Sequence, residues 1–420
     1  MKLLAAAAAV LIISTAVYAE DYSFDIPGKE MLELSGNLDV KYSVLSARKD
    51  SPMYQLQYYN RQLSDILSSY LMEFYLNGDY QTKDVGVHLK THSEYYSDNQ
   101  TDFNLYELYA DVNLSAHSFL LMGKKMYNWG KGYAFNPVGY VNPVKDPENP
   151  ELSQSGLFSI NYEYSKSFQT GLVKNIALDL IVIPSANTIN NKVSEIQYTD
   201  FAGKLYFLFL DADIDFVHYL SKANPEKAGI DFSRNIFTNL EMHGEFSMFR
   251  GQPKYLIADN SPETKYIDGA SYLFGMRWLN EWNITTILEY YHNDAGVSVN
   301  EFKDYNRFLA NAASSGNDSI VSNAISINRN NFNGANIMQD YLYLKMSWPE
   351  PFNLIYFTPA VYTIFNINDG GSIIGIPLSY KPVTNFEFLF RPVFLTGNSN
   401  SEFGSKQYKN KLEMWMRFYF

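Results

Sequence analysis

Near its start the chain reads Leu32-Glu33-Leu34-Ser35-Gly36-Asn37-Leu38-Asp39-Val40-Lys41-Tyr42-Ser43-Val44. Apolar residues alternate with polar ones along this stretch. Because successive side chains of a β-strand point to opposite faces, the stretch predicts a strand with one apolar and one polar face. Strands in soluble proteins average about 5 or 6 residues, whereas a tilted membrane strand needs about 9 to 11. The length of the alternation therefore favours a membrane strand over a strand of a soluble sandwich.

The same alternation recurs along the chain, and very short turns alternate with longer polar connections between the predicted strands. Alternating strands lie at 158–164, 240–248, 272–278 and 411–420. Short turns fall near 81–83, 115–117, 211, 281–282, 349–352 and 381–384, and longer connections near 46–67, 128–153, 185–200, 294–337 and 396–407. Short turns at one end and longer loops at the other are typical of an all-β, transmembrane antiparallel β-barrel.

The number of strands follows from parity. A barrel chain that enters and leaves on the periplasmic side has an even number of strands. Counting inwards from both termini gives eighteen strands if one poorly patterned strand lies near Lys254–Ala258, and sixteen is the alternative. The Asn-rich segment 311–336 is predicted to be a loop. Residues 31–420 are predicted to form this barrel as a single domain.

The first residues form a separate unit. Met1 and Lys2 precede an apolar run that lasts to Ser14, and Val17-Tyr18-Ala19 follows. This order is typical of a secretory signal peptide, residues 1–19, that is removed after Ala19. The apolar run is shorter than the roughly 20 residues that cross a bilayer as a helix. Residues 20–30 are predicted to be a periplasmic lead-in to the barrel.

Composition narrows the classes of function. The 420 residues include 33 Lys and Arg and 45 Asp and Glu, a net charge of −12. This balance argues against a nucleic-acid partner, which needs a basic patch. The chain has no Cys, which excludes disulfides, thiolate metal sites and cysteine nucleophiles. A mean hydropathy of −0.24 is too polar for a bundle of membrane helices.

No metal site, cofactor or catalytic residue is predicted. His88 and His92 are four residues apart, which would suit a metal pair on a helix but separates them by about 13 Å on a strand. Asp146, Glu148 and Glu151 lack the spacing of a calcium-binding loop. The sequence contains no G-x-S-x-G motif, H-E-x-x-H motif or phosphate-binding glycine loop.

With these patterns the mature chain resembles the outer-membrane porins of Gram-negative bacteria over its whole length. The chain ends Trp415-Met416-Arg417-Phe418-Tyr419-Phe420, and Phe420 looks like the assembly signal that such barrels present to their insertion machinery. The stretch from Gly123 to Gly132 is similar to a basic segment of larger porin-like barrels, with Gly-Lys-Lys in place of Gly-Arg-Gln. The resemblance implies an outer-membrane location in contact with lipid, small polar solutes as partners, and a homo-oligomeric state.

The connection 128–153 is predicted to form a constriction. It follows the fifth strand, and in porins that the chain resembles the third external loop often folds into the barrel. Three Asn-Pro steps stiffen it, because Pro fixes its own φ and restrains the preceding residue. Its lysines are expected to oppose its carboxylates across a narrow gap, and a plain surface loop is the alternative. The candidate residues are Lys124, Lys125, Trp129, Lys131, Tyr133, Lys145, Asp146, Glu148 and Glu151.

The polar members of the alternating strands are predicted to line the lumen. Charged groups at such positions decide which ions or solutes pass, although many of them only solvate a wet wall. The candidates are Glu163, Glu241, His243, Glu245, Arg277, Glu289, Lys345, Glu387, Arg391, Glu413 and Arg417.

A passive diffusion channel for small polar solutes or ions is therefore the predicted function. One alternative is a barrel that sheathes a partner in an envelope complex, for example an electron-carrying cytochrome. A further alternative is an outer-membrane enzyme. A sheath would need a wide lumen free of an inward loop, whereas a channel would carry the constriction.

Overall fold

The computed structural model describes residues 31–185, 189–190, 195–332, 334 and 336–420. The predicted signal peptide, residues 1–19, and the predicted lead-in, residues 20–30, lie outside the described residues.

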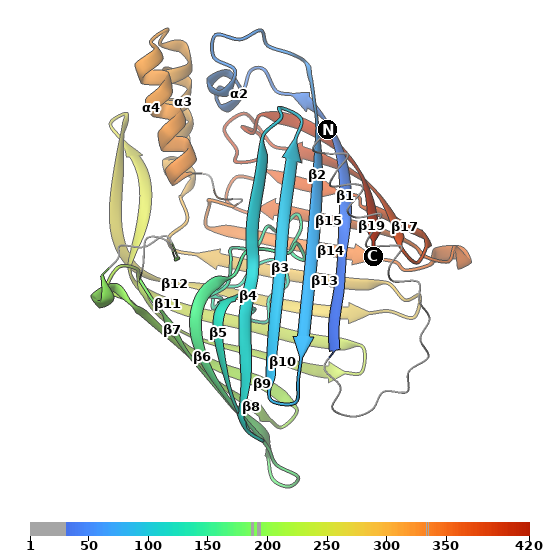
Figure 1. Cartoon of the computed structure of the whole chain (residues 1–420). Helices are drawn as coiled ribbons and strands as arrows, with labels where there is room; N and C mark the ends of the chain where they lie inside the picture. The colour runs from blue at the N-terminus through green and yellow to red at the C-terminus, as the bar shows by residue number, and fades with distance from the viewer. Residues whose placement is uncertain (1–30, 186–188, 191–194, 333, 335) are drawn as a thin grey trace.

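The strands form one closed antiparallel barrel (Figure 1). β1 (Met31–Ala47) pairs with β2 (Ile66–Gln81) on one side and with β19 (Tyr408–Tyr419) on the other, which closes the ring. The remaining bounds are β3 (Val85–Tyr96), β4 (Thr101–Ser115), β5 (Ser118–Lys125), β6 (Leu157–Ser167), β7 (Val173–Ile183), β8 (Asp200–Phe209), β9 (Ala212–Leu220), β10 (Glu226–Phe237), β11 (Leu240–Ala258), β12 (Ser261–Leu279), β13 (Thr285–Asn293), β14 (Asp340–Ser347), β15 (Phe357–Asn366), β16 (Ser372–Gly375), β17 (Leu378–Val383) and β18 (Phe386–Thr396).

The prediction of eighteen strands is confirmed. The sheet has 19 strand segments, but β16 and β17 both pair with β15 and with β18, so they are two parts of one strand. The interruption falls at Ile376 and Pro377, because proline has no N–H to donate to the sheet.

The placement of the weak strand near Lys254–Ala258 was wrong. These residues form the far end of β11 and pair with the start of β12. The two strands turn only at Asp259 and Asn260, both of which have positive φ. The hairpin is long, at 19 residues in each strand, so a change of pattern within one strand looked like a separate strand.

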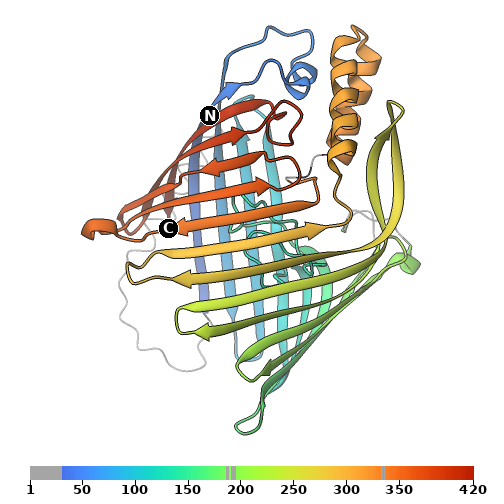
Figure 2. The same ribbon diagram turned by 180° about the vertical axis from the view of Figure 1, so that it is seen from behind.

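The two ends of the barrel differ. The end that carries the longer connections and the helices is called the loop end, and the end with the short turns is called the turn end. At the loop end lie α2 (Pro52–Gln57), α3 (Val299–Ser314) and α4 (Asp318–Asn331) (Figures 1 and 2). Short 3-10 turns η1 (Ile196–Tyr198) and η2 (Pro351–Asn353) complete the helical elements of the described residues. No helix in the described part of the chain is long and apolar enough to cross a membrane.

The prediction of a loop at 311–336 was wrong, because α3 and α4 occupy most of it. α3 begins with a capping box in which Ser298 and Glu301 satisfy each other's backbone N–H. Phe302, Tyr305 and Leu309 are buried at helical spacing along it. The burial of this apolar stripe outweighs the weak helix propensity of the Asn and Ser residues.

A buried apolar cluster fills part of the lumen. It runs from α3 and α4, past Phe403, along the inner face of β14 to β18, and reaches Phe135. On that wall the inward residues include Tyr341, Tyr343 and Ile364, each at most 1% exposed. The prediction that inward residues are the polar members of the strands was therefore incomplete for this side of the barrel, where Lys345 and Arg391 face inward beside these apolar residues.

Candidate functional site

The connection between β5 and β6, residues 126–156, lies inside the ring of strands (Figures 1 and 2). We call it the inner segment. It contacts β9, β10, β11 and β13, and also β14, β15, β18 and β19. In the ring β5 is bordered by β4 and β6, and β6 by β5 and β7, so the segment reaches those strands across the lumen. Residues 127–141 are called the anchored arm, and residues 148–153 the pocket arm.

Glu245 of β11 holds the anchored arm by its backbone. Its Oε1 accepts hydrogen bonds from the N–H groups of Lys131 at 2.7 Å and Gly132 at 2.6 Å. Its Oε2 accepts from the N–H of Val138 at 3.0 Å, and the Asn136 side chain donates to Oε1 at 3.1 Å. A buried backbone N–H group that lies outside helices and strands needs another hydrogen-bond acceptor. Here the single carboxylate of Glu245, which is 3% exposed, accepts the hydrogen bonds of a whole turn of the chain.

Glu289 of β13 accepts hydrogen bonds from the next backbone N–H groups of the anchored arm. Its oxygens accept from the N–H of Tyr133 at 2.5 Å and of Ala134 at 2.9 Å. On its other side Nε2 of His243 lies 3.0 Å from Oε1 of Glu289. The carboxylate of Glu289 is 0% exposed. Glu245 and Glu289 thus fix consecutive parts of the anchored arm against β11 and β13, which lie on either side of β12.

A lysine of the anchored arm also pairs with the wall. Nζ of Lys131 lies 2.7 Å from Asp215 and 3.7 Å from Asp231, which face each other across β9 and β10. Burial lowers the pKa of Lys131, but the hydrogen bond and charge of Asp215, helped by Asp231, outweigh burial and hold the pKa above its ordinary value. Lys131 therefore stays charged in this site.

Trp129 lies against the wall and away from open water. It is 3% exposed and packs in an apolar cluster with Ile181, Ile183 and Val217 on β7 and β9. Val138 of the same arm is buried in this cluster. The anchored arm therefore has both an apolar face and a hydrogen-bonded face in contact with the wall.

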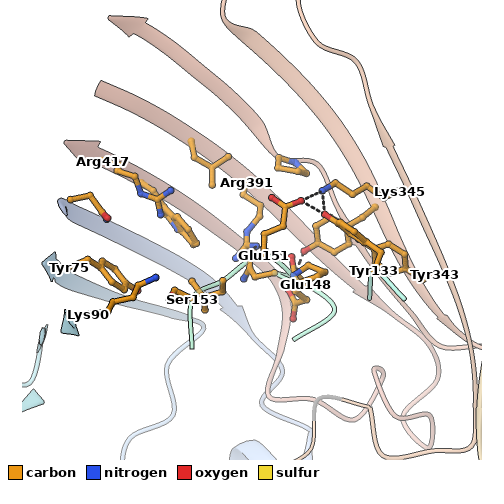
Figure 3. Close-up of a pocket in the computed structure, with 18 of the residues that line it drawn as sticks. Tyr75, Lys90, Tyr133, Glu148, Glu151, Ser153, Tyr343, Lys345, Arg391 and Arg417 are labelled. Carbon is orange, nitrogen blue, oxygen red and sulfur yellow. Dashed lines mark hydrogen bonds and ion pairs between the residues drawn. The ribbon is translucent and has the colours of Figure 1, made fainter. Parts of the chain in front are cut away.

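The pocket arm is held by side chains (Figure 3). Glu151 accepts a hydrogen bond from the Tyr133 hydroxyl at 2.5 Å and lies 3.4 Å from Nζ of Lys345 on β14. Lys345 also donates to the Tyr133 hydroxyl. Burial raises the pKa of Glu151, but Tyr133 and Lys345 lower it by more, so the pKa stays below its ordinary value.

Glu148 and Asn149 bind the next strands of the same wall. Glu148 lies 3.4 Å from Nζ of Lys411 on β19, and the Tyr362 hydroxyl of β15 donates to it at 3.3 Å. Arg391 of β18 donates to the side chain of Asn149 and at the same time pairs with Glu413. These contacts seat the pocket arm against β14, β15, β18 and β19.

A cavity of about 370 Å³ lies beside the pocket arm. Figure 3 shows basic side chains from opposite parts of the wall around it. Besides residues 148–153 and Tyr133, it is lined by Asn37, Tyr75, Asn77, Lys90, Tyr343, Lys345, Tyr362, Pro377, Leu389, Arg391, Trp415 and Arg417. The lining therefore combines cations, carboxylates, amides and aromatic rings.

The expected opposition of charges within the loop was wrong. Nζ of Lys145 donates to the carbonyls of Gly132 at 2.8 Å and Tyr133 at 3.1 Å. Asp146 accepts the N–H of Glu148 and so stabilises its own turn. The charges of the segment pair with the wall or with its own backbone, because the wall supplies partners that the sequence does not reveal.

The two lysines before the inner segment have different partners. Lys125 lies 3.1 Å from the carboxylate of Glu163, which it meets across β5 and β6. Nζ of Lys124 donates to the carbonyl of Leu105 at 2.6 Å. Lys125 therefore adds an ion pair to the wall, whereas Lys124 binds the backbone of a neighbouring strand.

The other predicted wall residues lie near opposite charges. Glu241 and Arg277 lie opposite each other across β11 and β12, and Glu241 is also 3.6 Å from His243. Arg417 pairs with Asp39 at 2.6 Å and lies 3.8 Å from Glu387. At the turn end, Phe420 exchanges backbone hydrogen bonds with Gly36 of β1; its role as an assembly signal stays a prediction.

One cluster in the lumen has the donor types of a metal site. The ligand atoms of Glu73, His92 and Glu94 lie within 4.8 Å of one another. However, Lys41 pairs with Glu73 and also lies 4.0 Å from the centre of the Trp415 ring. An ammonium group beside the carboxylate disfavours a cation there, so we assign no metal to this cluster.

The fold and the inner segment together define a class, the wide closed β-barrel whose lumen is crossed by a chain segment. The solved structures that are similar to this chain include the following three. The outer-membrane protein OpdK of Pseudomonas aeruginosa has a TM-score of 0.54 at 9% identity, over 92% of this chain and 98% of that one. OccK2 (OpdF) of P. aeruginosa, in complex with glucuronate, has a TM-score of 0.53 at 11% identity, over 92% and 97%.

The third is Wzi of Escherichia coli, an outer-membrane protein involved in group 1 capsule assembly and a carbohydrate-binding β-barrel. Its TM-score is 0.52 at 11% identity, over 91% of this chain and 84% of that one. At these identities the likeness shows a shared fold. No protein-family model matches the chain, and no curated protein sequence does.

Proposed function

We propose that the protein is an outer-membrane channel through which small polar solutes diffuse passively, and that the inner segment is its constriction. The observation that carries the proposal is the inner segment itself, which crosses an eighteen-strand barrel and borders a polar cavity. A barrel of about eight strands is filled by side chains, whereas sixteen or more leave an aqueous channel. A segment across such a lumen narrows it without closing it.

The membrane orientation follows from the two ends. The loop end faces the outside and the turn end faces the periplasm, as in outer-membrane barrels. In support, exposed apolar residues such as Leu180, Phe216 and Phe274 lie on the outer faces of their strands. The interpretation of residues 1–19 as an export signal agrees with this location.

The chemistry of the cavity favours polar solutes. Lys90, Arg391 and Arg417 offer donors, and Glu148 and Glu151 offer acceptors. Such groups replace the water of a solute rich in hydroxyl or carboxylate groups, whereas an apolar solute gains nothing from them. Two similar structures are described with glucuronate or as carbohydrate-binding, and solutes of that polarity are the ones we propose here.

Single-channel conductance in a planar bilayer tests the proposal. Replacing residues 146–153 by a shorter Gly-Ser linker is expected to raise conductance severalfold and to weaken ion preference, because it removes the pocket arm and keeps the anchored arm. A matched control replaces residues 221–225, the connection between β9 and β10. Unchanged conductance in a barrel that still migrates as folded before heating would refute the constriction, and absence of any conductance in the natural protein would refute the channel.

A sheath around a partner such as an electron-carrying cytochrome is less well supported. It needs an open lumen, but here the inner segment and the apolar cluster from α3 to Phe135 occupy much of it. The channel is therefore the function that the geometry favours. A homo-oligomeric state stays a prediction.

A further inference from the structure

The turn between β14 and β15 differs from the other turns at its end of the barrel. It spans residues 348–356, whereas its neighbours at 280–284 and 384–385 are shorter. Four of its side chains are apolar or aromatic and open to the surroundings: Phe352 is 83% exposed, Leu354 53%, Ile355 61% and Tyr356 61%. Figures 1 and 2 show the turn, in orange, projecting sideways from the end of the barrel.

The turn is an ordered structure. The N–H of Glu350 donates to Phe357, and the N–H of Leu354 donates to Pro351. The carboxylate of Glu350 accepts the N–H of Tyr356 at 3.1 Å, so the one charged side chain of the turn is used inside it. Phe352 and Tyr356 have φ values of +56° and +64°, a conformation that bulky residues rarely adopt. The hydrogen bonds thus hold these apolar side chains outward at the expense of backbone strain.

The outer surface next to the turn indicates what surrounds it. The N–H of Trp348 donates to the carbonyl of Pro359 at 3.0 Å, so the pairing of β14 with β15 continues into the turn. Outward residues next to the turn, Met346 on β14 and Tyr380 on β17, are themselves exposed apolar groups. The apolar turn therefore continues the lipid-facing outer surface of β14 and β17.

We propose that residues 352–356 insert into the periplasmic leaflet of the outer membrane, between the headgroups and acyl chains of its lipids. The proposal rests on the membrane location in the proposed function but not on channel activity. Lipid is the occupant that fits, because the turn is continuous with the lipid-facing band and its one charged side chain, Glu350, accepts a hydrogen bond from the backbone of the turn itself.

Nitroxide labelling tests this directly, because the chain has no Cys and each introduced one is unique. The variants are Phe352→Cys and Ile355→Cys, in vesicles of phosphatidylethanolamine and phosphatidylglycerol. Phe365→Cys, on the outer face of β15, is the lipid control, and Lys83→Cys, in the turn 82–84, is the water control. Collision rates with molecular oxygen and with a water-soluble nickel chelate are measured at each site, and folding is checked by migration before and after heating.

We expect the labels at 352 and 355, like the label at 365, to collide more often with oxygen than with the chelate. The label at 83 is expected to collide more often with the chelate than with oxygen. Chelate collisions at 352 and 355 as frequent as at 83 would overturn the proposal, since they place the turn in water. Exclusion of both reagents would also overturn it, because a second copy or another protein would then cover the turn. If the label at 365 also collides more with the chelate than with oxygen, the proposed membrane location is refuted. That result differs from one in which only the labels at 352 and 355 are exposed to water, which refutes the insertion of the turn alone.

Discussion

The two arms of the inner segment are held in opposite ways. The anchored arm offers backbone N–H groups to two buried carboxylates, Glu245 and Glu289. The pocket arm offers side chains to cations of the far wall, and the side chain of Glu151 is 75% exposed. A buried backbone donor that loses its acceptor costs about 1–3 kcal/mol, whereas an exposed ion pair contributes about 0–1 kcal/mol. The anchored arm therefore fixes the position of the inner segment. The more weakly held pocket arm is the part whose changes alter the solute selectivity of the cavity.

The largest effect is expected for Glu245→Ala. It leaves three backbone N–H groups without their acceptor and removes one of the two hydrogen bonds of the Asn136 amide, which costs about 1–3 kcal/mol for each buried donor left unpaired. We expect the segment to leave the wall, conductance to rise severalfold, and a protease to cut within 127–141. Glu241→Ala, on the same face of the same strand, is the control and should change little. Natural conductance in the Glu245 variant would contradict the anchoring role.

A smaller effect is expected for Glu289→Gln. The amide keeps one oxygen acceptor but turns an NH₂ group toward donors, so one of the two N–H bonds from Tyr133 and Ala134 is lost. We expect a midpoint of thermal unfolding that falls by a few degrees and a noisier open channel. If Gln and Ala at 289 behave alike, the hydrogen bonds to the backbone are not what this residue contributes.

Lys345→Met is expected to leave the segment in place and to alter selectivity. The change removes the cation beside Glu151 and leaves the negative charge of that carboxylate, which still accepts from the Tyr133 hydroxyl, uncompensated at the cavity. Cation preference, measured as reversal potential under a salt gradient, should rise, and the rise should shrink at high salt because exposed charges are screened. Stability should change by less than about 1 kcal/mol. An unchanged reversal potential would mean that Lys345 does not face the permeating ions.

The smallest effect concerns pH. The pKa of Glu151 is lowered in the fold from its ordinary value of 4.5. A lowered carboxyl pKa adds stability that is fully present above the ordinary value and is lost as pH falls through the folded value. Conductance should therefore stay constant down to about 4.5 and change only below it, as the pocket arm loosens. Glu151→Gln should lack this component, and an identical acid response in both proteins would exclude Glu151 as its source.

Local periodicity predicts the inward residues but not their partners. Glu245 and Glu289 were predicted to face the lumen because alternation is a property of a few consecutive residues. Their role depends on contacts more than a hundred residues away along the chain, with Lys131 and Tyr133. Those contacts require the closed ring and its register, which no local pattern contains. Asp215 was missed for the same reason.

The residue composition of two other regions led the sequence patterns to miss α3 and the inward-facing tyrosines. The apolar stripe of α3 is present in the sequence, but the Asn and Ser residues around it suggested a loop. Tyr343 and Tyr362 line the cavity, yet they were missed because their strands are apolar on both faces and alternation no longer separates inside from outside. Strands that pack against an apolar cluster in the lumen, as here, are apolar on both faces. They lack the alternation of polar and apolar residues by which membrane strands are recognised.

The prolines of the β14–β15 turn have a consequence for export of the chain. Between Tyr341 and Phe365 the sequence has only two charged residues, Lys345 and Glu350. An unfolded chain crossing the inner membrane is retained there when about 20 apolar residues form a helix. Pro349 and Pro351 oppose a helix at the middle of this tract, and the charge of Glu350 adds about 2.5–3.5 kcal/mol against insertion. Under the proposed outer-membrane location, the residues that shape the turn in the finished barrel thus also oppose retention of the tract in the inner membrane.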